Sequence, residues 1–284
     1  MTMQLGPYRI LRPLAEDSLG RTYLAVEGDE QVVVRRLAPT LLGDPRAGER
    51  LRAWAARLGE SPSPGLARVR GLFPQSDHHT LLVMQLPAGT SLAELLVHRS
   101  TLAERPGGNR SAPLPGALAI AQRLAAILAA AHSRGSYHLR LSPDKVFLDT
   151  SGEKTAGLQV CVLELGLFSA LAEGGRVPGP SAPAHTYLAP EQAGAGPSTV
   201  PMLGDGQSDV YALGVLLVQL LTGQTPERAE WPAAVAQLQS SAAPAGLGSL
   251  LREMLAEEPP RRPSMVQVEA VLGLAARSPE SPPC

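Results

Sequence analysis

Among the charged residues of this chain, Arg35, Arg140, Lys145 and Glu164 carry side chains that could bind an anion or a metal ion. A guanidinium group stays protonated and carries only donors, so Arg140 cannot accept a proton or coordinate a metal. The ammonium group of Lys145 repels divalent cations, whereas Glu164 offers the hard carboxylate oxygens that Mg²⁺ prefers. These residue types can bind an anion, but as a metal site they supply a single ligand, Glu164.

The composition of the 284-residue chain limits the partners and the cellular compartment that we expect. The formal net charge of -1 gives no reason to expect a nucleic acid or an anionic membrane as an obligatory partner. Two cysteines, Cys161 and Cys284, cannot form a disulfide framework and suggest a reducing compartment. The longest apolar stretch, residues 210–221, is too short to span a bilayer and is expected to be a buried core helix. We therefore expect a cytoplasmic chain without a membrane span.

The elements that must position these residues change from strands to helices along the chain. The first part predicts five strands and one helix, and the second part predicts helices with two short strands. This order predicts an α+β fold with two lobes: a small, five-stranded β-rich lobe with one helix, then a larger, mainly helical lobe. The expected strands are 8–14, 22–27, 31–37, 66–73, 80–85, 146–148 and 158–163, and the expected helices include 48–58, 91–96 and 118–132. The lobes are expected at residues 8–86 and 87–274, the loops at 104–115 and 173–184, and a disordered tail at 275–284.

Four motifs, in this order, resemble landmarks of the eukaryotic-type protein kinases, especially the bacterial Ser/Thr branch. Residues 137–145 occupy the place of the catalytic loop, and residues 187–191 end in the Ala-Pro-Glu element of the family. Residues 208–215 resemble the start of its central buried helix, and residues 261–264 its late Arg-Pro element. Each motif alone is weak, but together they cover about residues 8–272. The resemblance implies a bilobal kinase fold with a nucleotide cleft between the lobes.

Five retained residues have structural roles by this resemblance. Glu191 is expected to pair with Arg262, which fixes the geometry of the larger lobe. Asp209 is expected to accept backbone N–H groups from the catalytic-loop turn, which contains the structural residue His138. Gly166 is expected to permit a sharp bend of the backbone. None of these residues performs chemistry.

By the same resemblance, the positions that carry out phosphoryl transfer hold other residues. Arg140 stands at the proton acceptor and Ser142 at the following lysine. Lys145 replaces the metal-binding Asn, and Glu164 replaces the metal-binding Asp, where it stays a weak metal candidate. No catalytic residue of the family is therefore intact. The alternative that Arg140 and Lys145 are surface charges without a role stays open.

The phosphate end of the expected nucleotide cleft is altered too. Of the glycines of the phosphate-covering loop, only Gly20 remains in residues 14–20. Asp17 would place a carboxylate near phosphate oxygens, which is repulsive. Arg35 stands at the strand lysine, and its usual glutamate partner is not clear, because Glu49 is the nearest acid but the spacing aligns Leu51.

The adenine end carries a different set of changes. Gln85 and Leu86 fall in the hinge, and the next residue, Pro87, has no N–H to donate to adenine. Val33 and Phe147 each add volume to a site that must accept a flat base. The alternative that Val33 and Phe147 are ordinary core residues is kept. The cleft positions implied are Gly20, Val33, Arg35, Gln85, Leu86 and Phe147, and we expect no cofactor, with ATP binding weak or absent.

Three readings of function follow. The first is a catalytically inactive kinase domain, a pseudokinase, that acts as a protein-binding or allosteric module in signalling, with an active kinase or its substrate as partner. The second is an atypical ATP-dependent Ser/Thr protein kinase or phosphotransferase with residual activity, using Glu164 and Arg35. The third is a metal-independent nucleotide or anion sensor, in which Arg35, Arg140 and Lys145 converge and ATP binds without Mg²⁺. Ser169, Ser181 and Thr186 are candidate phosphorylation sites, although exposure without regulation is the simpler reading of each.

Overall fold

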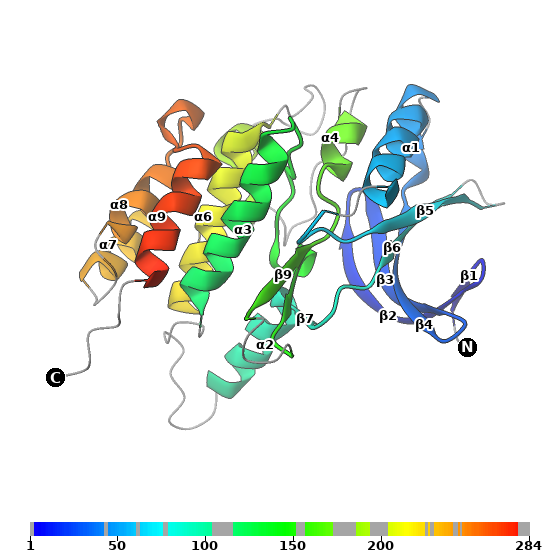
Figure 1. Ribbon diagram of the computed structural model, residues 1–284, viewed down its shortest axis with the longest axis horizontal. Helices are drawn as coiled ribbons and strands as arrows, with labels where there is room; N and C mark the ends of the chain where they lie inside the picture. Colours follow the sequence, from blue (N-terminus) through cyan, green and yellow to red (C-terminus); the bar gives the residue numbers. More distant parts are fainter. Residues whose placement is uncertain are drawn as a thin grey trace.

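A strand-rich lobe and a helix-rich lobe meet near Pro87, which confirms the predicted α+β bilobal architecture (Figure 1). The computed structural model describes residues 3–42, 45–60, 63–75, 79–103, 116–151, 157–172, 186–193, 204–224, 227, 230–240, 244 and 246–277. The predicted loops at 104–115 and 173–184 lie outside these ranges. The predicted tail does so from residue 278 onward.

The smaller lobe is built on one antiparallel sheet with the strand order β1-β2-β3-β4-β6-β5. All five predicted strands are present, and the short β1 adds a sixth at the edge beside β2. Predicted residues 66–68 do not belong to β5, since Leu66 instead forms an isolated bridge with Val162. The strands are β1 (Gln4–Leu5), β2 (Tyr8–Asp17), β3 (Gly20–Glu27), β4 (Glu30–Leu37), β5 (Val69–Pro74) and β6 (Thr80–Gln85).

The segment aligned with the phosphate-covering loop is mostly strand, which corrects the expectation for residues 14–20. Strand β2 continues to Asp17, which pairs with Gly20 across a tight turn. Gly20 has φ +129°, and a β-carbon there would lie 2.0 Å from the carbonyl oxygen of Arg36. Leu19 at the tip is 3% exposed and joins the hydrophobic core. Gly20 therefore allows two strands to approach closely, and the side chain of Leu19 fills the space at the turn.

The helix of the smaller lobe, α1 (Pro45–Glu60), covers the sheet near the cleft (Figure 1). Leu51 and Trp54 are buried on its inner face, whereas Glu49 is exposed. Leu51, which the spacing aligns with the glutamate partner of the strand lysine, thus points into the lobe. Helix α1 presents an apolar residue at this position. A short helix that was not predicted, α4 (Leu167–Ala172), packs against α1 and receives a hydrogen bond of 2.9 Å from Arg50 Nε at the carbonyl of Ala170.

The larger lobe is organised around α6 (Gly206–Thr222), in which 12 of 17 residues are buried, as predicted for the apolar stretch. Helix α3 lies beside α6 and α9 (Figure 1). Helix α9 continues to Arg277, so the first three residues of the predicted tail are helical. In the described ranges, no helix has the length and apolar character needed to cross a membrane. The remaining elements are η1 (Pro39–Leu42), β7 (Thr90–Ser91), α2 (Leu92–Ala103), α3 (Ala117–His132), η2 (Pro143–Lys145), β8 (Val146–Asp149), β9 (Gln159–Val162), α5 (Pro190–Ala193), α6 (Gly206–Thr222), α7 (Trp231–Ser240), α8 (Leu247–Met254), η5 (Pro259–Arg261) and α9 (Met265–Arg277).

Candidate functional site

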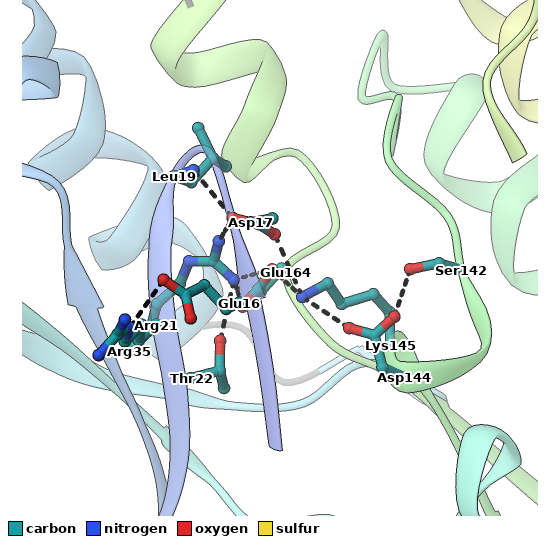
Figure 2. Close-up of polar contacts among 10 residues, drawn as sticks. All are labelled: Glu16, Asp17, Leu19, Arg21, Thr22, Arg35, Ser142, Asp144, Lys145 and Glu164. Atoms are coloured by element: carbon teal, nitrogen blue, oxygen red, sulfur yellow. Dashed lines mark hydrogen bonds and ion pairs between the residues drawn. The ribbon is translucent and has the colours of Figure 1, made fainter. Parts of the chain in front are cut away.

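Arg35 reaches from β4 across the interlobe cleft to Glu164. Its side chain is fully buried, and its Nη1 donates to Glu164 Oε1 at 2.8 Å and to Thr22 Oγ1 at 2.9 Å. Its Nη2 forms an ion pair with the carboxylate of Asp17 at the end of β2. Figure 2 shows the guanidinium group between these two acids. The strand arginine is therefore paired with the larger lobe and with its own turn, and α1 supplies no carboxylate to it.

Lys145 approaches the same glutamate from the larger lobe. Its Nζ lies 3.1 Å from Glu164 Oε2, 3.0 Å from Asp144 Oδ2 and 3.7 Å from Asp17 Oδ2 (Figure 2). Asp144 also accepts a hydrogen bond of 2.6 Å from Ser142 Oγ. The sequence analysis did not single out Asp144, although its place directly before Lys145 in the catalytic-loop segment was a usable signal. Glu164 thus binds one cation from each lobe.

Burial and ion pairing have opposite effects on the pKa values of Glu164, Lys145 and Asp144. Burial alone would raise the pKa of Glu164, but the charges of Arg35 and Lys145 outweigh it and hold the pKa below its ordinary value. Burial alone would lower the pKa of Lys145, and the carboxylates of Asp144 and Glu164 hold it above its ordinary value instead. Burial opposes the charge of Asp144 too, and Lys145 lowers its pKa. At neutral pH all of these groups are charged.

Arg140 lies at the cleft but does not join the pairs around Glu164. Its guanidinium carbon lies 4.1 Å from the ring centroid of Phe168, a cation–π contact. Its Nη1 and Nη2 are buried and find no hydrogen-bond partner among the described residues. Burial lowers the pKa of Arg140 to about 10. The three expected cations therefore do not converge on one point.

The local charge also differs from the expectation of a positive cleft. Three acids face three bases there, so the cluster is neutral overall. Asp17, expected to repel a phosphate, is instead a partner of Arg35 and Lys145. The interlobe cluster consists of Asp17, Arg35, Arg140, Asp144, Lys145 and Glu164.

The backbone of Glu164 is held in an uncommon conformation. Its φ is +60°, and Leu139 in the catalytic-loop turn has φ +63°, a region that residues other than glycine seldom adopt. Gly166, two residues after Glu164, has φ +79°, and a β-carbon there would lie 2.9 Å from Ser136 Oγ. Such conformations persist where surrounding contacts enforce them. The bend expected at Gly166 is present, and it begins at Glu164.

The pairs implied for the retained residues are present. Asp209 is fully buried and accepts N–H groups of His138 and Leu139 at 2.8 and 2.7 Å. Glu191 and Arg262 form a two-pronged pair, with Nη1 and Nη2 each 2.8 Å from a carboxylate oxygen. These contacts fix the catalytic-loop turn and the Ala-Pro-Glu segment to the core of the larger lobe.

The side chains expected at the adenine end of the cleft are buried together. Val33 and Met84 are fully buried, Phe147 is 4% exposed, and all three belong to one hydrophobic cluster. In the hinge, Gln85 is exposed and Leu86 is partly buried. A cavity of about 410 Å³ opens at the other end of the cleft, between residues 14–19 and the catalytic loop.

The candidate metal and phosphorylation residues have their own surroundings. In the described part of the chain, no group of three or more His, Cys, Asp or Glu side chains could hold a metal ion. Ser169 lies on α4 rather than in a loop, and its hydroxyl donates to the carbonyl of Tyr137 at 2.9 Å. Thr186 is partly buried, and Ser181 lies outside the described residues.

Comparison with known proteins agrees with this fold and these motifs. A family profile described as "Protein kinase domain" matches residues 12–271. The chain is 30% identical over 298 residues to the serine/threonine-protein kinase pkn2 of Myxococcus xanthus, which covers 96% of this chain and 33% of that protein. It is 27% identical over 226 residues to the probable serine/threonine-protein kinase PknB of Lactococcus lactis, covering 77% of this chain and 32% of the relative. The chain thus spans about a third of the length of these two relatives.

Among solved structures, the chain resembles the kinase domain of Mycobacterium tuberculosis PknI. The TM-score is 0.65 at 21% sequence identity, and the match covers 96% of this chain and 98% of that domain. At this identity the likeness concerns the fold. The family profile covers nearly the whole chain, and we conclude that this chain belongs to the protein kinase domain family.

Proposed function

We propose that this chain is a catalytically inactive protein kinase domain that acts as a binding or allosteric module in signalling. The observation that carries the proposal is that one residue, Glu164, neutralises Arg35 of one lobe and Lys145 of the other. In the family, the cleft between the lobes is where phosphates and metal ions are held. Here, internal ion pairs supply the charge neutralisation.

The residues of the cleft do not fit Mg²⁺ and ATP. To bind a metal, Glu164 would have to weaken its pairs with Arg35 and Lys145, and each of these buried cations would lose a carboxylate partner. Lys145 places an ammonium group where a second metal ligand is needed, and Arg140 offers no acceptor for a substrate proton. The packing of Val33 against Met84 and Phe147 further opposes the entry of an adenine ring.

The same pairs suggest how such a domain would work as a module. An active kinase closes its lobes around a nucleotide, whereas Arg35–Glu164 and Lys145–Asp17 connect these lobes without one. A preorganised surface loses less conformational entropy when it binds a partner. The partner we propose is a protein, either an active kinase or a substrate of one.

Two measurements test the proposal. Purified protein is incubated with radiolabelled ATP and Mg²⁺, with the kinase domain of Bacillus subtilis PrkC, a relative named as a kinase, as the positive control. We expect no phosphate incorporation into the chain or into a general substrate. Steady incorporation would disprove the proposal.

Thermal unfolding with ATP, with and without Mg²⁺, separates the other two readings. A bound ligand raises the melting temperature by mass action, so we expect no shift at millimolar nucleotide. A shift that requires Mg²⁺ would favour the transferase with residual activity, and a shift without Mg²⁺ would favour the nucleotide sensor.

A further inference from the structure

A second cavity, of about 640 Å³, lies outside the charged cluster. It is bounded by α1, residues 63–66, α3 with the turn that follows it, and β9, together with Leu165. Its size is that of a typical pocket for a small organic ligand. Because α1 belongs to the smaller lobe and α3 to the larger one, the cavity opens between the lobes, as the positions of these helices indicate (Figure 1).

The walls of this cavity are largely apolar. On α1, Trp54 and Leu58 are four residues apart and share one face of the helix. They are opposed by Leu66, by Ile127 of α3 and by Val160 of β9. These surfaces can hold the apolar body of a ligand.

Three arginines line the same cavity: Arg57 on α1, Arg123 on α3 and Arg134 in the turn after α3. All three are exposed. Arg57 and Arg123 have no ion-pair partner among the described residues, and Arg134 donates from Nε to the carbonyl of Ala130 at 2.9 Å. None of the described residues that line the cavity carries a carboxylate.

Two of these arginines lie on either side of one run of cavity residues. Arg123, Ile127 and Ala130 follow each other at intervals of four and three, so they lie on one face of α3, and Arg134 follows in the turn after the helix. The wall formed by α3 and this turn therefore has a charge on either side of Ile127. For a chain of net charge -1, three arginines around one cavity, none with an ion-pair partner among the described residues, are a local excess of positive charge.

We propose that this cavity binds an organic anion, with an apolar body against Trp54, Leu66 and Ile127 and a carboxylate, sulfonate or phosphate group held by the arginines. Arginine suits this task because its planar fork binds such oxyanions through two donors at once. The site is independent of the nucleotide cleft, so it does not depend on whether the domain is catalytically inactive.

A ligand in this cavity could affect the charged cluster through the segment that carries Glu164. Leu165 lines the cavity and directly follows Glu164, and its carbonyl accepts a hydrogen bond of 2.9 Å from the indole Nε1 of Trp54. A ligand there would contact the segment that carries Glu164 and both helices beside it. Occupancy would thus stabilise the lobe arrangement in which Glu164 is paired.

The test uses anilinonaphthalene sulfonate, a fluorescent aromatic anion, as the probe. We expect saturable binding with one site per chain, and displacement by decanoate but not by inorganic phosphate or by octanol at equal concentration. The triple variant Arg57→Gln, Arg123→Gln, Arg134→Gln should weaken probe binding about tenfold or more. The matched control is Arg9→Gln, Arg52→Gln, Arg252→Gln, which removes the same charge from exposed arginines that do not line the cavity.

A second pair of variants keeps the test informative if the triple variant does not fold. Ala130→Trp fills the cavity from an exposed helix position, and Ala53→Trp adds the same side chain at an exposed position outside it. Loss of probe binding in Ala130→Trp with retention in Ala53→Trp supports the site. Non-saturable probe binding, equal loss in variant and control, or displacement by octanol or phosphate as effective as by decanoate would each overturn the proposal.

Discussion

Two buried charge networks occupy this molecule, and they differ in how completely their donors are satisfied. In the larger lobe, Arg262 places all five of its N–H donors: on Glu191 twice and on the carbonyls of Gln207, Ala256 and Glu257. In the interlobe cluster, Nε of Arg35 and both Nη atoms of Arg140 find no partner among the described residues. Arg262 therefore makes a complete set of hydrogen bonds, whereas Arg35 and Arg140 do not.

The difference between the two networks separates residues that stabilise the fold from residues at positions that the family uses for chemistry. The contacts of the Arg262 network lie within one lobe, and by the resemblance its residue types match those of the family. The contacts of the interlobe cluster join two lobes, and we infer that its residue types replace those that the family uses for chemistry. Partly satisfied networks stabilise less than fully satisfied ones. We therefore expect the larger lobe to lose more stability per broken contact than the cleft.

The largest expected effect is that of Arg262→Ala. Removing the buried Arg262 takes the cation from Glu191, which is 25% exposed and keeps the Ser208 hydroxyl as a donor, and takes the donor from three carbonyls. We expect a loss of about 3–5 kcal/mol in unfolding free energy. The neighbouring Arg261→Ala is the control, because Arg261 is 72% exposed and pairs with Glu258 on the surface. Urea unfolding of both variants provides the measurement. Similar losses in the two would remove the basis of the comparison.

The second effect is the coupling between Arg35 and Glu164. We expect Arg35→Leu and Glu164→Leu each to destabilise the protein, and the double variant to be more stable than the sum predicts, by about 1–3 kcal/mol. The exposed pair Arg21–Glu16, on the same turn, is the control cycle and should show no measurable coupling. Additive losses for Arg35 and Glu164 would mean that the pair does not hold the lobes.

The sequence predicted the framework better than the cleft, and the reason is physical. The strands, α3 and α6 follow from local hydrophobic periodicity, and the Glu191–Arg262 pair from motifs that fix residue types. The pairing of Asp17 with Arg35 depends on how a turn folds over a strand, which no periodicity encodes. Helix α4 was missed because residues 167–172 are too short for a helical pattern to be distinguished.

A pH titration gives a smaller effect that sharpens the comparison. Burial lowers the pKa of His138, whose Nδ1 accepts the N–H of Arg140 at 3.3 Å. The unfolded chain takes up this proton below an ordinary pKa of about 6.5, whereas the folded chain does not until lower pH. Stability from His138 is thus present above about pH 6.5 and lost as the pH falls through the folded pKa, by up to about 1.4 kcal/mol per pH unit.

We expect His138→Gln to have a flatter stability profile between about pH 7 and pH 5 than the parent chain. His98→Gln, at an exposed position of α2, is the control for the loss of one histidine. The pKa values of Asp144 and Glu164 are held below their ordinary values, so these two carboxylates lose their contribution at still lower pH and do not obscure this window. An unchanged slope in His138→Gln would mean that the buried ring is not held neutral.

The smallest expected effect is that of Arg140→Asp on catalysis. This change restores a carboxylate at the proton-acceptor position, yet Lys145 still opposes the metal and Glu164 stays paired with Arg35. We expect no phosphate incorporation from radiolabelled ATP by this variant, as for the parent chain. A variant that also carries Lys145→Asn tests whether Lys145 is what still prevents activity. Because Val33 and Phe147 pack in one hydrophobic cluster, we expect little turnover even in this double variant. Measurable turnover in Arg140→Asp alone would show that the paired cluster opens readily, and the contrast between a rigid framework and a self-neutralised cleft would no longer support the proposed inactivity.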